Sequence, residues 1–170
     1  MIDFKDIKSH KNGREWAFEE LSYQIFEKEK GDGKPVIRRD GSGGDGGIEA
    51  YVADHQGRVI VGLQAKYFIN GLRAQQWAQL DKSVLTTLKR NQDDCVLREY
   101  IITLPINLSE KQQNNWGCHV TKWKEEATRL GYVDIEFTLW TESKLRLFLE
   151  EERFKGHRLY WFGFPDFDLS

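Results

Sequence analysis

The chain has 170 residues, of which 39% are hydrophobic and 31% are charged, a composition typical of one globular domain. No apolar run approaches the roughly 20 residues of a membrane-spanning helix, and the first residues show no signal-peptide pattern. The formal net charge of −2 excludes a bulk polyanion binder of the histone kind, so a nucleic-acid partner requires unevenly spread Lys and Arg residues. Two cysteines without a C-x-x-C pair favour a reducing, cytoplasmic location.

The first predicted helix begins at Gly13, after a short polar lead-in over residues 1–12. Phe18, Leu21 and Ile25 recur at the three- and four-residue spacing that places apolar side chains on one helix face. The helix is expected to end at Gly31-Asp32-Gly33. A short strand is then predicted over residues 35–38. The glycine-rich run that follows, residues 40–47, contains five glycines in eight residues, and no regular element is expected there.

A β-hairpin is predicted between residues 48 and 66, with a two-residue turn at Gln56-Gly57. The apolar face of this register pairs Ile48 with Ala65, Ala50 with Leu63, and Val52 with Val61. The other face pairs Glu49 with Gln64, Tyr51 with Gly62, and Ala53 with Ile60. Lys66 lies two residues beyond Gln64 on that second face. The hairpin therefore gathers Glu49, Gln64 and Lys66 at one end of one face.

Helices and strands alternate in the remainder of the chain. Helices are predicted over residues 72–89, 114–130 and 141–150, and strands over residues 98–104 and 132–139. This order predicts an α/β/α sandwich with a central mixed β-sheet and helices on both faces. We expect a single domain over residues 1–170, with a core of about 14–150. Residues 151–170 form an aromatic tail that closes the core or docks onto another part of the protein or a second copy.

The end of the predicted hairpin combines groups that suit a hard divalent cation. The carboxylate of Glu49, the amide oxygen of Gln64 and the carbonyl of Ala65 would form a partial shell for Mg²⁺, which prefers oxygen ligands and keeps several waters. Lys66 would orient or deprotonate a bound water, or stabilise charge that develops on a phosphate. Hydrolysis of a phosphodiester needs this combination. The alternative interpretation is an ordinary solvated ladder of polar residues.

These residues resemble the PD-(D/E)XK nucleases, and within them the Mrr-type restriction endonucleases. Residues 43–49 (GGDGGIE) and 64–67 (QAKY) are similar to the pattern G-x-G-D-G-G-(I/V)-(D/E) followed by Q-x-K. Residues 18–21 (FEEL) are similar to an F-E-x-L opening. The motifs cover about residues 14 to 68, and the order of elements extends the resemblance to about residue 150. Residues 140–145 (WTESKL) further resemble the N-terminal nuclease domains of bacterial antiviral STAND NTPases.

The resemblance implies a restriction-endonuclease-like fold and a Mg²⁺-dependent endonuclease, with Mn²⁺ as a substitute. Its substrate would be double-stranded DNA, cut with low sequence specificity in antiphage defence after activation by homo-oligomerisation. In that group the nuclease precedes NTPase and sensor domains. The sequence has no G-x-x-x-x-G-K-[ST] phosphate loop, so the chain is expected to be the N-terminal effector part of a larger protein.

The resemblance also assigns catalytic roles. Glu49 takes the position of the second-strand acid, where Asp is commoner, Gln64 takes the variable Glu or Gln position, and Lys66 takes the lysine position. Glu19 fits the helix acid best, with Glu15 as its rival.

Periodicity places Glu20 outward on the same helix. Asp45 matches the acid inside the glycine run, where it would reach a metal or hold the turn. Arg38 and Arg39, with the backbone at Gly44 and Gly46, are candidates for binding substrate phosphate, although the two arginines equally suit a solubilised edge strand.

Two other functions fit the same sequence. One is a non-catalytic interaction or oligomerisation module on a nuclease-like fold, and the other is a nuclease specific for RNA or for junctions. The near-neutral net charge also predicts weak intrinsic affinity for DNA, strongly dependent on salt, with several copies supplying avidity.

Overall fold

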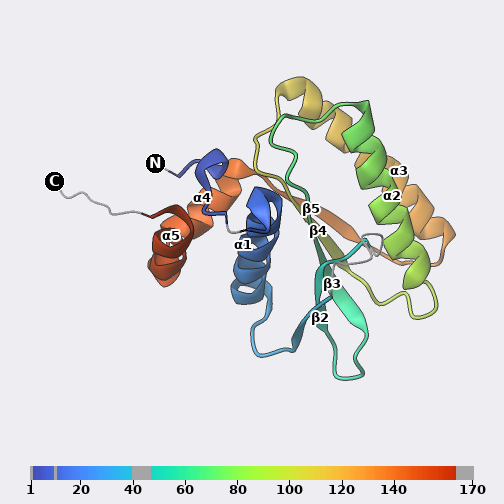
Figure 1. Ribbon diagram of the computed structural model, residues 1–170. Coiled ribbons are helices and arrows are strands. Elements are labelled where there is room, and N and C mark those ends of the chain that lie inside the picture. The colour runs from blue at the N-terminus through green and yellow to red at the C-terminus, as the bar shows by residue number, and fades with distance from the viewer. Residues whose placement is uncertain (1, 10, 40–46, 164–170) are drawn as a thin grey trace.

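The computed structural model describes residues 2–9, 11–39 and 47–163. Five strands form one mixed sheet in the spatial order β1-β2-β3-β4-β5 (Figure 1). The two pairs β1–β2 and β2–β3 are antiparallel, whereas β3–β4 and β4–β5 are parallel. The strands are β1 (Val36–Arg38), β2 (Ala50–Ala53), β3 (Val59–Ala65), β4 (Glu99–Thr103) and β5 (Glu136–Trp140).

Helices cover both faces of this sheet, which confirms the predicted α/β sandwich with a mixed sheet. On one side lie α1 (Gly13–Lys30), α4 (Glu142–Glu150) and α5 (Lys155–Phe162), and on the other lie α2 (Ala74–Arg90) and α3 (Glu110–Arg129) (Figure 1). Two short 3₁₀ helices, η1 (Phe4–Asp6) and η3 (Glu152–Phe154), accompany the first group. None of the described helices is long and apolar enough to cross a membrane.

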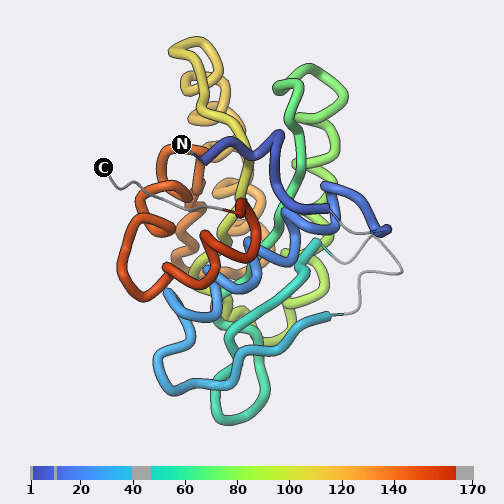
Figure 2. The backbone as a smooth tube through the Cα atoms, turned by 60° about the vertical axis from the view of Figure 1, so that its left-hand side comes forward, coloured from blue at the N-terminus to red at the C-terminus, as the bar shows by residue number. Residues whose placement is uncertain are grey.

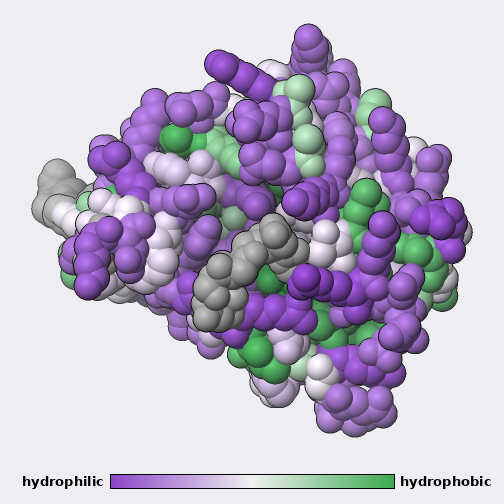
Figure 3. Space-filling model, turned by 45° about the vertical axis from the view of Figure 1, so that its right-hand side comes forward, coloured by the Kyte–Doolittle hydropathy of each residue, from purple (hydrophilic) through white to green (hydrophobic). Residues whose placement is uncertain are grey.

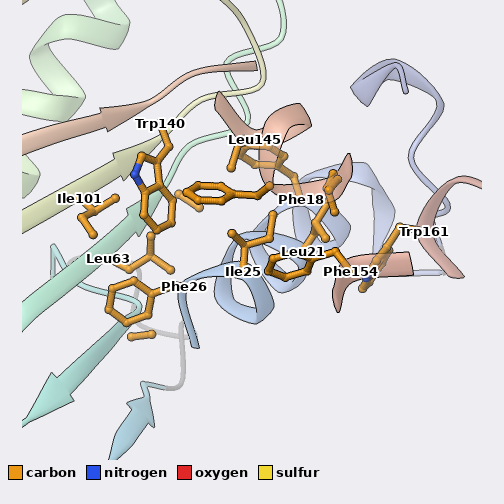
Figure 4. Packing of buried hydrophobic residues seen from close by; sticks show 14 of the residues in the cluster. Phe18, Leu21, Ile25, Phe26, Leu63, Ile101, Trp140, Leu145, Phe154 and Trp161 are labelled. Atoms are coloured by element: carbon orange, nitrogen blue, oxygen red, sulfur yellow. The ribbon is translucent and has the colours of Figure 1, made fainter. Parts of the chain in front are cut away.

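The apolar stripe of α1 packs against the sheet as its spacing predicts. Phe18, Leu21 and Ile25 are buried and point toward Leu63 of β3 and Trp140 of β5 (Figure 4). Burial of each such side chain contributes about 2 kcal/mol, so this contact fixes α1 along the central strand. The stripe therefore positions the polar residues of α1 that flank it.

A second core fills the space under α2 and α3. Trp77, Leu80 and Val84 of α2 and Trp123 of α3 share this core with Tyr100 of β4. The outer surface of the molecule is mainly hydrophilic, with small hydrophobic areas between charged side chains on the face that Figure 3 shows. The strongly apolar residues are thus divided between two cores, one on each face of the sheet.

The hairpin register is confirmed at its centre and differs at both ends. Ala50 pairs with Leu63, Tyr51 with Gly62 and Val52 with Val61, as predicted. Ala53 pairs with Val59 instead of Ile60, because a β-bulge interrupts the ladder there. The loop holds three residues rather than two: Asp54 and Arg58 form its closing hydrogen bond at 3.0 Å, and Gly57 adopts a φ of +79°.

Ile48 is the second difference. It was expected on the apolar face with Ala50, but it packs in the core under α2, where its side chain covers Gly62. β2 begins only at Ala50, so the strict alternation of a strand does not extend back to residue 48.

The bounds of one helix and one strand also differ from the prediction. The helix predicted over 114–130 begins at Glu110, because Ser109 and Gln112 form a capping box, with the Ser109 hydroxyl accepting from the Gln112 N–H at 3.2 Å. The strand predicted over 132–139 is limited to β5, although Tyr132 remains buried in the core.

The two terminal segments meet in the core beside α1. The expected polar lead-in contains three buried residues, Ile2, Phe4 and Ile7. From the expected tail, Phe154 and Trp161 are buried in the same cluster, and the Lys8 N–H donates to the Trp161 carbonyl at 2.7 Å. Figure 2 shows the first and last described segments side by side. Of the three roles considered for the tail, residues 154 to 162 therefore close the domain's own core.

Candidate active site

The candidate site lies at the carboxyl end of β3. Glu49, directly before β2, reaches this end with its side chain: Oε2 accepts a hydrogen bond from the Ala65 N–H at 2.6 Å and another from Gln64 Nε2 at 3.2 Å. Gln64 is buried, and its Nε2 also lies 3.5 Å from the Ala65 carbonyl oxygen. Glu49 and Gln64 are therefore brought together, as the hairpin predicted.

Glu19 of α1 faces this pair from the helix layer. Burial is the main cause that raises the pKa of Glu49 from 4.5 to about 7, and the negative charge of Glu19 raises it further. The pKa of Glu19 is itself raised, first by burial and then by the charge of Glu15. Glu15 is exposed, whereas Glu19 is half-buried and acts on Glu49. Of the two rival helix acids, Glu19 is the one that the fold places beside Glu49.

Lys66 supplies positive charge next to both acids. It follows β3 directly, and its N–H donates to the Thr103 carbonyl at 3.0 Å, so the backbone is held where the strand ends. Its ammonium group lowers the pKa of both Glu19 and Glu49, against the larger effect of burial. The end of β3 thus combines two partly buried carboxyl groups, one amide and one cation.

Arg38 is engaged in an ion pair rather than held free for substrate. Its guanidinium pairs with Glu20 and lies 5.2 Å from the centre of the Tyr23 ring. The expectation that Glu20 points outward is wrong, because its side chain is only 14% exposed and lies against β1. The charge of Arg38 still lowers the pKa of Glu49.

Arg39 lies against the sheet next to the same site. Its guanidinium stacks 4.9 Å from the centre of the Tyr51 ring, and its N–H donates to the Glu49 carbonyl at 2.7 Å. The backbone of Arg39 therefore helps to fix Glu49, while its role toward phosphate stays a prediction.

Three predicted residues, Gly44, Asp45 and Gly46, lie outside the described residues. The last glycine of that run, Gly47, is described and is packed against α2. A Cβ atom there would lie 2.2 Å from Thr87 Oγ1 and 2.3 Å from the Ser83 carbonyl oxygen, and its φ of +73° favours glycine. The Gly47 carbonyl accepts a hydrogen bond from the buried hydroxyl of Tyr100.

Tyr100 and Thr87 are residues that the sequence did not single out. Tyr100 fixes the backbone two residues before Glu49 from a position 53 residues away in the chain. A Tyr in a buried strand carries no signal of its hydrogen-bond partner, so only the fold shows this contact.

The side chains around Glu49 offer few ligands for a divalent cation. Among the described residues, no group of three or more His, Cys, Asp and Glu side chains could hold a metal ion. Glu19 and Glu49 are nevertheless interacting carboxyl groups with raised pKa values. A cation would relieve this repulsion, and Mg²⁺ needs only one or two carboxylates because it keeps several waters. The residues therefore fit Mg²⁺.

Comparisons with known proteins give no support for a family. No model of a protein family, no curated protein and no solved structure matches the chain.

Proposed function

We propose that this chain is a Mg²⁺-dependent endonuclease that hydrolyses double-stranded DNA. The observation that carries the proposal is the pair of partly buried carboxyl groups, Glu19 and Glu49, gathered with Lys66 at the end of a central strand. An acid pair that is only partly compensated and has raised pKa values is typical of a functional site, since it costs stability. A lysine beside it is the group that phosphoryl chemistry requires.

Each residue of the site has a role in this proposal. Glu49 and Glu19 would hold Mg²⁺ or Mn²⁺, which when bound supplies positive charge to the phosphate oxygens. The Ala65 N–H and Gln64 orient the Glu49 carboxylate through their hydrogen bonds to Oε2. Lys66 holds an ammonium charge where negative charge develops on the phosphate oxygens as water attacks the phosphorus and the bond to the leaving oxygen breaks.

The wider setting is proposed on the resemblance to Mrr-type nucleases. In that setting the chain is the N-terminal effector of a larger cytoplasmic protein with NTPase and sensor domains, and it acts in antiphage defence when copies assemble. The order of helices and strands supports this proposal only in that it agrees with the element order on which the resemblance rests.

A second candidate function is a non-catalytic interaction module. It is favoured by large apolar side chains on the outer surface: Leu147 of α4 and Leu159 of α5 are each 61% exposed. Exposed apolar residues of this kind are found where partner proteins dock.

A plasmid-cleavage assay tests the main proposal. Supercoiled DNA is incubated with the wild type, with Lys66→Ala, and with Lys124→Ala, a control that removes an exposed lysine of α3. We expect nicking and linearisation in Mg²⁺ or Mn²⁺, none in EDTA, and a loss of about 100-fold or more in Lys66→Ala alone. Equal rates for the wild type and Lys66→Ala would contradict the proposal.

Oligomerisation and substrate class are tested in the same assay. The chain is fused to a dimeric coiled coil, so that two sites can act on one duplex. Cleavage of duplex DNA in preference to RNA and to four-way junctions is expected. Absence of cleavage in the fused protein, with no heat of Mg²⁺ binding by calorimetry, would favour the interaction module.

A further inference from the structure

A polar hollow of about 530 Å³ opens next to the candidate site. It lies between η1, the first turn of α1 and the segment that follows β3. The side chains that line it include two cations, two hydroxyls, an amide and one aliphatic group, and the described ones include no acid: Lys5, Ser9, Arg14, Tyr67, Ile69 and Asn70. This volume and this lining suit a phosphate group with part of its sugar.

The two cations of the hollow are unpaired within the described part of the chain. Neither Lys5 Nζ nor the guanidinium of Arg14 forms an ion pair there, and both side chains are exposed. Six other Lys and Arg side chains of the described part do form ion pairs with acids: Lys30–Glu99, Arg38–Glu20, Arg58–Asp54, Arg129–Glu126, Arg146–Glu142 and Arg153–Glu29. The hollow thus holds two positive charges that form no ion pair with a described acid.

The charge of the surrounding segment supports this reading. Residues 2–14 carry four cations, Lys5, Lys8, Lys11 and Arg14, against two acids, whereas acids exceed cations in the whole chain. Of the two acids, Asp3 already accepts from the Lys5 backbone N–H at 2.9 Å. The pKa of Tyr67 is raised chiefly by burial; the charge of Arg14 lowers it, and the charges of Asp3 and Asp6 raise it.

The hollow borders the candidate site through Tyr67. This residue follows Lys66 directly, and its hydroxyl donates to the Phe4 carbonyl at 3.0 Å, which ties η1 to the end of β3. Its ring also packs against Phe18 of α1, at 5.6 Å between ring centres. Arg14 lies five residues before Glu19 on α1, about 7.5 Å along the helix axis.

We propose that this hollow binds the phosphodiester backbone of duplex DNA beside the phosphate that is cut, with Lys5 and Arg14 as the phosphate contacts. The inference rests on the proposed nuclease function, because the hollow borders the site at which DNA would be cut. It also gives the near-neutral chain a local basic surface. Contacts of this kind position a duplex without reading its sequence.

Binding without cleavage tests the proposal. Anisotropy of a labelled 20-base-pair DNA duplex is measured in EDTA at several chloride concentrations. The wild type is compared with Lys5→Gln/Arg14→Gln and with Lys122→Gln/Lys124→Gln, which removes the same charge from exposed positions of α3. We expect the first double variant to bind about tenfold or more weakly and its log–log salt slope to fall by about two. The control variant is expected to keep the wild-type slope.

Three results would overturn the inference. The first is a Lys5→Gln/Arg14→Gln variant, folded by circular dichroism, that binds like the wild type. The second is a wild type that does not bind at low salt. The third is displacement of the duplex by inorganic phosphate where chloride of equal ionic strength has no effect, since the hollow would then hold a free anion. The proposed function fails separately: a wild type that binds through Lys5 and Arg14 but never cuts would refute the nuclease alone.

Discussion

The two ends of the parallel strands each hold a largely buried glutamate, and the fold treats them differently. At the amino end, Glu99 of β4 pairs with Lys30 at 3.0 Å and accepts from the Thr138 hydroxyl at 2.7 Å. At the carboxyl end, Glu49 faces a second acid, Glu19, and its pKa is raised to about 7. α1 contributes to both ends, with the cation Lys30 at one and the acid Glu19 at the other.

This difference separates an acid that stabilises the fold from the one that we propose takes part in cleavage. The Lys30–Glu99 pair returns part of the desolvation cost of Glu99, so that the residue ties α1 to the sheet. The charge of Glu49 is only partly compensated by Lys66 and Arg38, so its ionisation costs stability until a further cation arrives. Ionised Glu49 therefore destabilises the fold at the carboxyl end, whereas the partners of Glu99 offset its burial at the amino end.

The largest expected effect is on cleavage. Glu49→Gln keeps the shape and one oxygen acceptor for the Ala65 N–H but removes the negative charge, so cleavage should fall by about 100-fold or more. Glu99→Gln should retain cleavage within a few-fold, while the free energy of unfolding falls by about 1–2 kcal/mol. Plasmid cleavage and urea denaturation measure the two quantities. A Glu99→Gln variant as inactive as Glu49→Gln would show that the two ends are not distinct.

The second effect is on the pH dependence of stability. Because the pKa of Glu49 is raised from 4.5 to about 7, the folded chain binds more protons than the unfolded chain between these pH values. The free energy of unfolding should therefore fall as pH rises through that window, by at most about 3 kcal/mol from this residue.

Urea denaturation in EDTA at pH 5 and pH 8 measures this dependence in the wild type and in Glu49→Gln. Glu19, whose pKa is also raised, gives both proteins a slope of the same sign. We expect the variant to be the more stable protein at pH 8 and to lose less stability between the two pH values. Parallel losses in both proteins would refute the assigned pKa of Glu49.

The smallest effect concerns the residue that fixes the backbone before Glu49. Tyr100→Phe removes the hydrogen bond to the Gly47 carbonyl, and Tyr132→Phe removes a matched bond from a buried hydroxyl to the Leu88 carbonyl. Each should cost about 1 kcal/mol of stability. Only Tyr100→Phe should also reduce cleavage, by about tenfold, because Tyr132 lies away from the site. Equal cleavage in the two variants would assign Tyr100 a purely structural role.

The fold could be predicted where local patterns were complete. The stripe of Phe18, Leu21 and Ile25 fixed both the extent of α1 and the face that it buries. The register at Val52 and Val61 followed from alternation alone. The bulge beside Ala53 did not, because a three-residue loop and a two-residue turn fit the same residues and only the closed ladder distinguishes them.

The candidate site was predicted more by residue type than by geometry. Glu49 and Gln64 meet as expected, but through the reach of the Glu49 side chain to the end of β3 rather than as partners in a ladder. The pairing of Arg38 with Glu20 was missed because periodicity along a helix does not show which strand passes beside it. Lys5 and Arg14 were missed because their hollow joins three segments that are distant in sequence.

The meeting of the chain's two terminal segments has a consequence for synthesis. Phe4 near the start packs in one cluster with Phe154 and Trp161. The Phe162 ring stands edge-on to the Phe4 ring, with 5.6 Å between the ring centres. A ribosome therefore delivers the last pieces of this core about 150 residues after the first. Until then the nascent polypeptide exposes the apolar face of α1. We therefore expect a chaperone to bind this face during translation and to dissociate once Trp161 has emerged from the ribosome.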